Sequence, residues 1–342
     1  MKKINFLFYS IFLSMLIVSC SKDQNQNNLY EKGIFVLNQG TYPNGASALT
    51  HIDHNDSVVT DVYSLQNNNT KLGSVAQGLA FGESKSYITI NNGGSVKIID
   101  SKTLISIKDV TGFELPRYVA IGENKVFISQ WGADGFSGSV KVLENDVIAA
   151  TINTGGAPEK MLIDGNNLYI TMTNGFKADD RLLVVDVNTY AITKEITLSK
   201  GVNSIIKASD GSIWVACEGE FQVSPDPIDD GRIYQLKNNV ILNEIGAPNG
   251  CSNLSYAEDK NAFFFTNNEG LHSLPLSNPT ATKQISTYGF LYGLAYDKES
   301  GLLFASDPGD YTTQGKIICF DTEGQKVKSF ASAIVPAQIV IR

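Results

Sequence analysis

The feature that most constrains the fold of this chain is a unit that recurs every 40 to 49 residues. Each unit opens with a short apolar strand, turns into a second and strongly apolar strand, and continues through a polar loop to a third strand. The first strands start at Gln77, Arg117, Glu159, Asn203, Ser252, Tyr292 and Ala337. A period of this length, with about four strands in each unit, is typical of β-propellers.

The two ends of the chain complete the count. Residues 335–341 form a first strand with nothing after it, and residues 33–38 form a second strand with nothing before it. We therefore expect Ile339, Val340 and Ile341 to be the innermost strand of a blade begun by Ile34 to Asn38, because a shared blade leaves no sheet edge unpaired at the closure. The sequence predicts an all-β fold, a seven-bladed β-propeller closed by its N- and C-terminal strands. An open solenoid would instead need caps at both ends.

The first residues are predicted to be a targeting segment. Lys2 and Lys3 precede a 15-residue apolar stretch, residues 4–18, which is shorter than the roughly 20 residues of a membrane-spanning helix. The stretch ends in Ile17-Val-Ser-Cys20, which resembles the lipobox of bacterial lipoproteins, in which the cysteine becomes the lipidated N-terminus. The alternative is an ordinary secretory signal followed by a chance cysteine.

These features predict three regions. Residues 1–19 would be a lipoprotein signal peptide, residues 20–32 the lipidated Cys20 and a polar, flexible tether, and residues 33–342 the propeller. We expect a lipid anchor in the outer membrane and exposure on the cell surface, with the periplasmic face as the alternative. The lipid would be the only contact with the membrane. A net charge of −8 without a basic run argues against nucleic-acid binding.

The sequence contains no motif for catalysis. There is no GxSxG, no HExxH and no cluster of Cys and His. His51 and His54 flank Asp53, where we expect a solvated hairpin rather than a metal site. We therefore predict no enzymatic activity, no cofactor and no metal.

Two further groups of residues could be misread as functional sites. Asp226, Asp229 and Asp230 offer oxygen atoms that could bind Ca²⁺, but they lack EF-hand spacing, so we expect a solvated acidic loop. Cys217 and Cys319 lie in apolar strands, where buried free thiols are the expectation.

The loops that precede the first strands and follow the second strands share one face of a propeller, and that face is the usual binding funnel. Aromatic and carboxamide side chains gather in these loops, a combination that suits a planar, hydrogen-bonding ligand or a protein epitope. Arg117 and Glu159 stand at matching positions of adjacent units, so we expect them to pair. The predicted ligand-binding residues are Tyr42, Gln77, Arg117, Trp131, Phe136, Glu159, Phe176, Asn203, Phe221, Asn253, Tyr292, Tyr311 and Gln338.

Four segments carry a resemblance to a known family: Gly33-Ile-Phe-Val-Leu-Asn-Gln-Gly, Val75-Ala-Gln-Gly, Pro116-Arg-Tyr-Val and Ala157-Pro-Glu-Lys-Met. They look like the YVTN/YncE-like propellers, and more narrowly like the "surface layer protein" lipoproteins. That group includes surface-exposed cobalamin-binding lipoproteins that partner TonB-dependent transporters. The resemblance implies the propeller fold, and it suggests a corrinoid ligand and an outer-membrane transporter as partner.

These observations favour a non-enzymatic surface protein that captures a ligand, plausibly a corrinoid, for a TonB-dependent transporter. One alternative is a protein-interaction or adhesion propeller without a small ligand. A remote alternative is a lactonase-like or quinoprotein-like enzyme, which would need a carboxylate-lined metal at the channel mouth.

Overall fold

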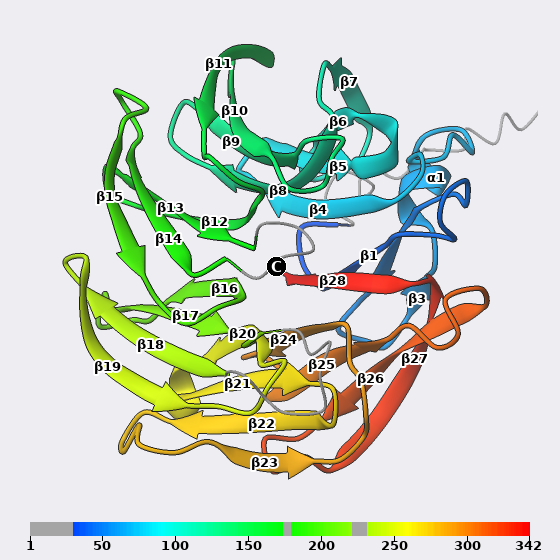
Figure 1. Ribbon diagram of the computed structural model, residues 1–342. Helices are drawn as coiled ribbons and strands as arrows, with labels where there is room; N and C mark the ends of the chain where they lie inside the picture. The colour runs from blue at the N-terminus through cyan, green and yellow to red at the C-terminus, as the bar shows by residue number, and fades with distance from the viewer. Residues whose placement is uncertain (1–29, 174–178, 221–230) are drawn as a thin grey trace, which may run out of the picture.

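The computed structural model describes residues 30–173, 179–220 and 231–342, which form seven four-stranded antiparallel sheets arranged in a ring (Figure 1). The predicted seven-bladed β-propeller is therefore confirmed. Among the described residues, no helix is long and apolar enough to cross a membrane. The helical segments in this part of the chain are one short α-helix and two 3₁₀ turns, α1 (Val62–Gln66), η2 (Asn91–Gly93) and η3 (Glu258–Lys260).

We number the blades in chain order and name their strands from the innermost outward. Blade one is β4 (Ala76–Phe81), β5 (Lys85–Ile90), β6 (Ser95–Asp100) and β7 (Ser106–Thr111). Blade two is β8 (Leu115–Ile121), β9 (Val126–Trp131), β10 (Gly138–Glu144) and β11 (Val147–Asn153). Blade three is β12 (Pro158–Asp164), β13 (Asn167–Met172), β14 (Arg181–Asp186) and β15 (Ile192–Thr197). Blade four is β16 (Val202–Lys207), β17 (Ile213–Cys217), β18 (Arg232–Lys237) and β19 (Val240–Gly246).

The remaining blades follow the same order. Blade five is β20 (Ser252–Ala257), β21 (Ala262–Asn267), β22 (Gly270–Pro275) and β23 (Lys283–Ser286). Blade six is β24 (Gly293–Asp297), β25 (Leu302–Asp307), β26 (Gln314–Phe320) and β27 (Lys326–Ile334). Blade seven is β28 (Pro336–Ile341), β1 (Ile34–Asn38), β2 (Ala48–Ile52) and β3 (Val58–Val59).

Blade seven closes the ring as predicted. The C-terminal strand β28 is its innermost strand and pairs antiparallel with β1, so that Ile341 faces Ile34 and Ile339 faces Val36 (Figure 1). Backbone hydrogen bonds between Gly33 and Arg342 continue this ladder in both directions, at 3.2 and 3.0 Å. The ring therefore has no open edge between its first and last blades.

The hydrophobic core is divided among the interfaces between blades. Second strands such as β5 and β17 are buried on both faces, because a blade on each side covers them, and this explains their continuous apolar sequences. At the interface of blades four and five, for example, the rings of Trp214 and Phe263 lie 4.9 Å apart. Outer strands such as β19 face solvent along most of their length.

Inner strands carry a β-bulge near the point where they enter the channel. The register shifts at Gln77, Arg117, Glu159, Asn203, Asn253 and Ala337, each of which is an extra residue opposite the second strand. A bulge leaves backbone groups of the ladder unpaired. Hydroxyl groups of the second strands satisfy them: Thr89 accepts from the Gly78 N–H at 2.8 Å and donates to the Arg117 carbonyl in the next blade at 2.6 Å.

Two glycines are required where the inner strands approach each other. A Cβ atom on Gly78 would lie 2.4 Å from the carbonyl oxygen of Arg117, and one on Gly293 would lie 2.1 Å from that of Ala337. The inner strands can therefore pack this closely only because these positions lack a side chain.

One expectation for the hairpin of blade seven that contains His51 and His54 is wrong. His51 is 4% exposed, packs on Phe35 with ring centroids 4.7 Å apart, and contacts the Lys32 carbonyl through Nε2 at 2.9 Å. His51 is therefore a core residue and not part of a solvated hairpin, whereas His54 is exposed. The burial expected for Cys217 and Cys319 is confirmed, and Cys251 is buried as well.

Candidate functional site

Two cavities follow one another along the axis of the ring. The channel cavity encloses about 230 Å³ and the mouth cavity about 280 Å³. Five side chains line both cavities, so the two form one continuous space: Gln77, Tyr118, Lys160, Asn253 and Tyr292.

The structure brings together seven of the predicted site residues around the mouth cavity. Six of them come from the bulged ends of inner strands or the residue just before one, and Trp131 ends the second strand β9. These seven residues are Gln77, Arg117, Trp131, Glu159, Asn203, Asn253 and Tyr292.

The other predicted residues do not line the mouth cavity. Tyr42 is 77% exposed, and Phe136 and Tyr311 also lie on the surface. Gln338 lines the channel cavity instead. Its amide is bonded to the backbone of Leu79, accepting at 2.7 Å and donating at 3.2 Å.

The prediction that Gln338 lies at the mouth is wrong by one residue, because the position that aligns with Gln77 and Arg117 is Ala337. The bulged position of blade seven is Ala337, which has no polar side chain to offer to the mouth. Phe176, Phe221 and the acidic residues Asp226, Asp229 and Asp230 lie outside the described residues.

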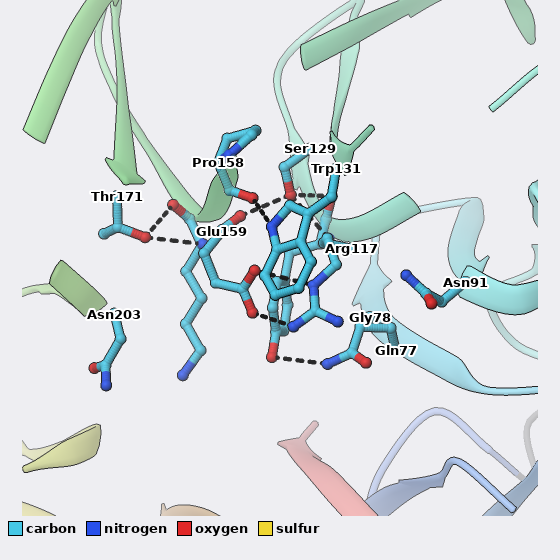
Figure 2. Close-up of polar contacts among 12 residues, drawn as sticks. Gln77, Gly78, Asn91, Arg117, Ser129, Trp131, Pro158, Glu159, Thr171 and Asn203 are labelled. Carbon is cyan, nitrogen blue, oxygen red and sulfur yellow. Dashed lines mark hydrogen bonds and ion pairs between the residues drawn. The ribbon is translucent and has the colours of Figure 1, made fainter. Parts of the chain in front are cut away.

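Arg117 and Glu159 form the expected ion pair, in bidentate geometry. Arg117 Nε donates to Glu159 Oε2 at 2.9 Å and Nη2 donates to Oε1 (Figure 2). Burial alone would lower the pKa of Arg117, but the Glu159 carboxylate raises it above the usual value. The Trp131 ring lies 4.0 Å from the guanidinium carbon and is fixed by its own N–H, which donates to the Pro158 carbonyl at 2.9 Å.

Lys160 and Glu218 are further charged residues of the mouth that sequence reasoning did not select. Lys160 Nζ forms no ion pair with any described residue; its one polar contact is with Asn253 Oδ1 at 3.4 Å. Burial lowers the pKa of Lys160, although Glu159 and Glu218 act in the opposite direction. Part of the Glu218 side chain is exposed to solvent, but partial burial of its carboxyl group raises its pKa.

Blade six contributes an aromatic wall, which we define as Phe290 and Tyr292. The two rings lie 5.8 Å apart, and Tyr311 backs Tyr292 at 6.4 Å. Phe290 is 43% exposed at the mouth. We define the charged wall as Arg117, Glu159 and Lys160, which belong to blades two and three, across the ring from blade six (Figure 1).

The carboxamides of the mouth mainly connect the blades to one another. Gln77 accepts from Gln39 at 3.0 Å and donates to the Tyr118 hydroxyl at 3.3 Å. Asn253, held at a φ of 55°, donates to the Tyr292 carbonyl at 3.2 Å. Asn203 differs, because its Nδ2 donates to Glu218 at 2.9 Å while its buried Oδ1 has no partner among the described residues.

Sequence reasoning missed Tyr118 and Lys160 because it assumed an uninterrupted strand. In a regular strand, neighbours of Arg117 and Glu159 point to the opposite face. The bulge instead lets two successive residues line the channel. A Ser or Thr repeated in the second strands was the sequence signal for these bulges. The hydroxyl groups of Ser129 and Thr171 accept hydrogen bonds from the backbone N–H groups of Tyr118 and Lys160, at 3.0 and 2.9 Å (Figure 2).

Comparisons with known proteins define the family. The model of a domain of unknown function, DUF5074, matches residues 32–329. The chain belongs to the DUF5074 family. No curated protein matches the sequence.

Solved structures support the fold of this DUF5074 protein. A quinonprotein alcohol dehydrogenase-like protein from Bacteroides thetaiotaomicron matches with a TM-score of 0.66 and 15% identity, over 91% of this chain and 78% of that one. BamB from Moraxella catarrhalis matches with a TM-score of 0.59 and 12% identity, over 91% and 86% of the two chains. At these identities the similarity shows the fold alone. The described residues contain no group of three or more His, Cys, Asp or Glu side chains that could hold a metal ion.

Proposed function

We propose that this DUF5074 protein is a non-enzymatic binding protein that holds a small ligand in the mouth of its propeller. The observation that carries the proposal is the combination of an aromatic wall, a charged wall and a continuous cavity between them. Binding sites for small molecules are concave, and they join apolar surface to a few fixed polar groups.

The size and chemistry of the mouth define the ligand that suits it. A cavity of about 280 Å³ is at the small end of ligand sites, which range over about 300–1,000 Å³. A compact ligand, or one arm of a larger ligand, therefore suits it. Phe290 and Tyr292 offer ring faces, Lys160 offers hydrogen-bond donors, and the Glu218 carboxyl group offers acceptors. These groups suit a planar molecule with both donors and acceptors on its edge.

The resemblance to cobalamin-binding lipoproteins leads us to propose a corrinoid as the specific ligand. A corrin ring is too large to enter the cavity whole, so it would lie over the mouth and insert one amide side chain. Phe290 and Tyr311, both exposed at this end, would then contact the ring. Most carboxamides of the mouth are already hydrogen-bonded within the wall, so they would hold the shape of the site and contribute little direct recognition.

The proposed lipid anchor bears on how a partner could reach the mouth. Strand β1 runs from Ile34, beside the C-terminal Arg342, to Asn38, beside Gln39 at the mouth. The chain therefore enters the propeller at the end opposite the mouth. With a lipid on Cys20, the mouth would face away from the membrane. Tyr30 is buried against the propeller, so a tether of the ten residues 20–29 would span at most about 35 Å, which is enough to let the propeller tilt toward a TonB-dependent transporter.

Calorimetric titration with cyanocobalamin tests the corrinoid proposal. We expect saturable binding with a Kd below about 1 μM, corresponding to about −8 kcal/mol. Phe290→Ala should weaken binding, while Val327→Ala, at an exposed position of the outer strand β27, is the matched control and should not. Absence of saturable binding would overturn the corrinoid and transporter proposals. Equal binding by the Phe290 variant would place the ligand elsewhere.

A further inference from the structure

Lys160 occupies an unusual position where the channel and mouth cavities join. Its side chain lines both cavities, and its ammonium group has no carboxylate partner among the described residues. The neighbouring carboxylate of Glu159 could pair with Lys160, but both of its oxygens already accept hydrogen bonds from Arg117. The amine of Lys160 therefore lies inside the propeller, at the wall of a cavity that small molecules can enter. It forms no ion pair with a described residue that would stabilise the fold.

The surroundings of Lys160 favour the neutral amine more than those of a surface lysine do. Burial lowers its pKa and the charge of Arg117 acts in the same direction, while Glu159 and Glu218 oppose them. Tyr118 faces the same space, with its ring centroid 5.8 Å from Lys160 Nζ. Glu218, which lines the mouth and whose pKa is raised by burial, is a group that can deliver a proton there. Environments that push an acid and a base in opposite directions characterise reactive sites.

We propose that Lys160 is an imine-forming lysine that captures small aldehydes or ketones entering the mouth. The neutral amine adds to the carbonyl carbon, and the resulting carbinolamine takes a proton on its oxygen and loses one from its nitrogen. Loss of water then gives the imine, so that one amine and one carbonyl compound yield one imine and one water, with no redox step. This inference goes beyond the proposed function and rests on it only in requiring that the mouth admits small molecules.

Reductive labelling with pyridoxal, a planar aldehyde, tests the inference. The purified protein is treated at pH 7 with pyridoxal and cyanoborohydride, which reduces an imine to a stable amine, and labelled lysines are identified by peptide mass spectrometry. Lys160 should be labelled several-fold faster than the exposed Lys108 and Lys326. The difference should shrink as the pH approaches 10, where surface lysines also lose their proton.

Two variants make the outcome specific. Lys160→Arg should abolish the fast label with an unchanged melting temperature, and Glu218→Gln should slow labelling while leaving Lys160 as its site. Labelling of Lys160 no faster than that of Lys108 and Lys326 would overturn the inference, even if ligand binding at the mouth is intact. Fast labelling of Lys160 together with a mouth that binds no other ligand would support the inference and count against the proposed function.

Discussion

Arg117 and Glu159 occupy the same bulged position in adjacent inner strands, and their bidentate ion pair joins blade two to blade three. The two side chains are 16% and 10% exposed. The pair is held from a second direction by Ser129, whose hydroxyl donates to the Glu159 carbonyl at 2.7 Å. The β-bulges at Arg117 and Glu159 thus bring the two side chains into contact between the blades, and the same side chains form the charged wall of the mouth.

Breaking this ion pair on one side should be costly. Arg117→Met leaves the Glu159 carboxylate buried and unpaired, a situation that typically costs about 3–5 kcal/mol. The double variant Arg117→Met, Glu159→Met removes both charges and should recover most of the lost stability. Urea unfolding of the two variants and the wild type measures this. If the double variant is as unstable as the single one, the pair does not act as a unit.

The closing strand should be essential to folding. Deleting residues 335–342 removes β28, leaves β1 without its inner partner, and takes away the buried Ile339. Each fully buried aliphatic side chain contributes about 1.5–3 kcal/mol, against about 5–15 kcal/mol for a whole domain. We expect aggregated or unfolded protein. Deletion of residues 21–29 is the control and should leave the melting temperature unchanged. A truncated protein that keeps its full melting temperature would contradict the shared blade.

The propeller should lose stability in mild acid through His51. Burial lowers the pKa of His51 in the folded protein below its ordinary value of 6.5. The unfolded chain therefore binds the proton more readily, and stability falls as the pH drops from 7 through the folded pKa. Each unit of lowering contributes about 1.4 kcal/mol.

Unfolding midpoints in urea at pH 7.5 and pH 5 measure this effect. His51→Gln should reduce the loss between the two pH values, because the glutamine does not titrate. His54→Gln, at an exposed position of the same hairpin, should retain the wild-type loss. Identical pH dependence in the His51 variant and the wild type would show that other groups, such as the buried His272, dominate.

The sequence allowed the fold to be predicted because its signal is repeated. The spacing of first strands and the half-units at both ends require seven blades and a shared closure, and each unit corroborates the others. The site was harder to predict from the sequence, because a shift of one residue in strand register decides which side chains line the channel. Gln338 was misplaced by one residue because the bulge of blade seven lies at Ala337. Lys160 was missed because a bulge breaks the alternation of an ordinary strand.

The lipid anchor stays a prediction, since Cys20 lies outside the described residues. Cys20→Ala should abolish lipid attachment and recovery of the protein in membrane fractions. The propeller should still fold, because every strand that the structure describes begins after Gly33. Fractionation of cells that express each form, with circular dichroism of the purified variant, checks both statements. A variant that still partitions fully with membranes would rule out the lipoprotein interpretation.

The most direct test of a ligand site in the propeller mouth is a crystallographic soak with compact planar compounds that carry polar edges. We predict that bound compounds gather in the mouth, between Phe290 and Tyr292 on one side and Arg117 and Lys160 on the other, and that Phe290→Ala crystals lose them. A mouth that stays empty while compounds occupy surface grooves, such as the one lined by Tyr256 and Tyr296, would contradict the account.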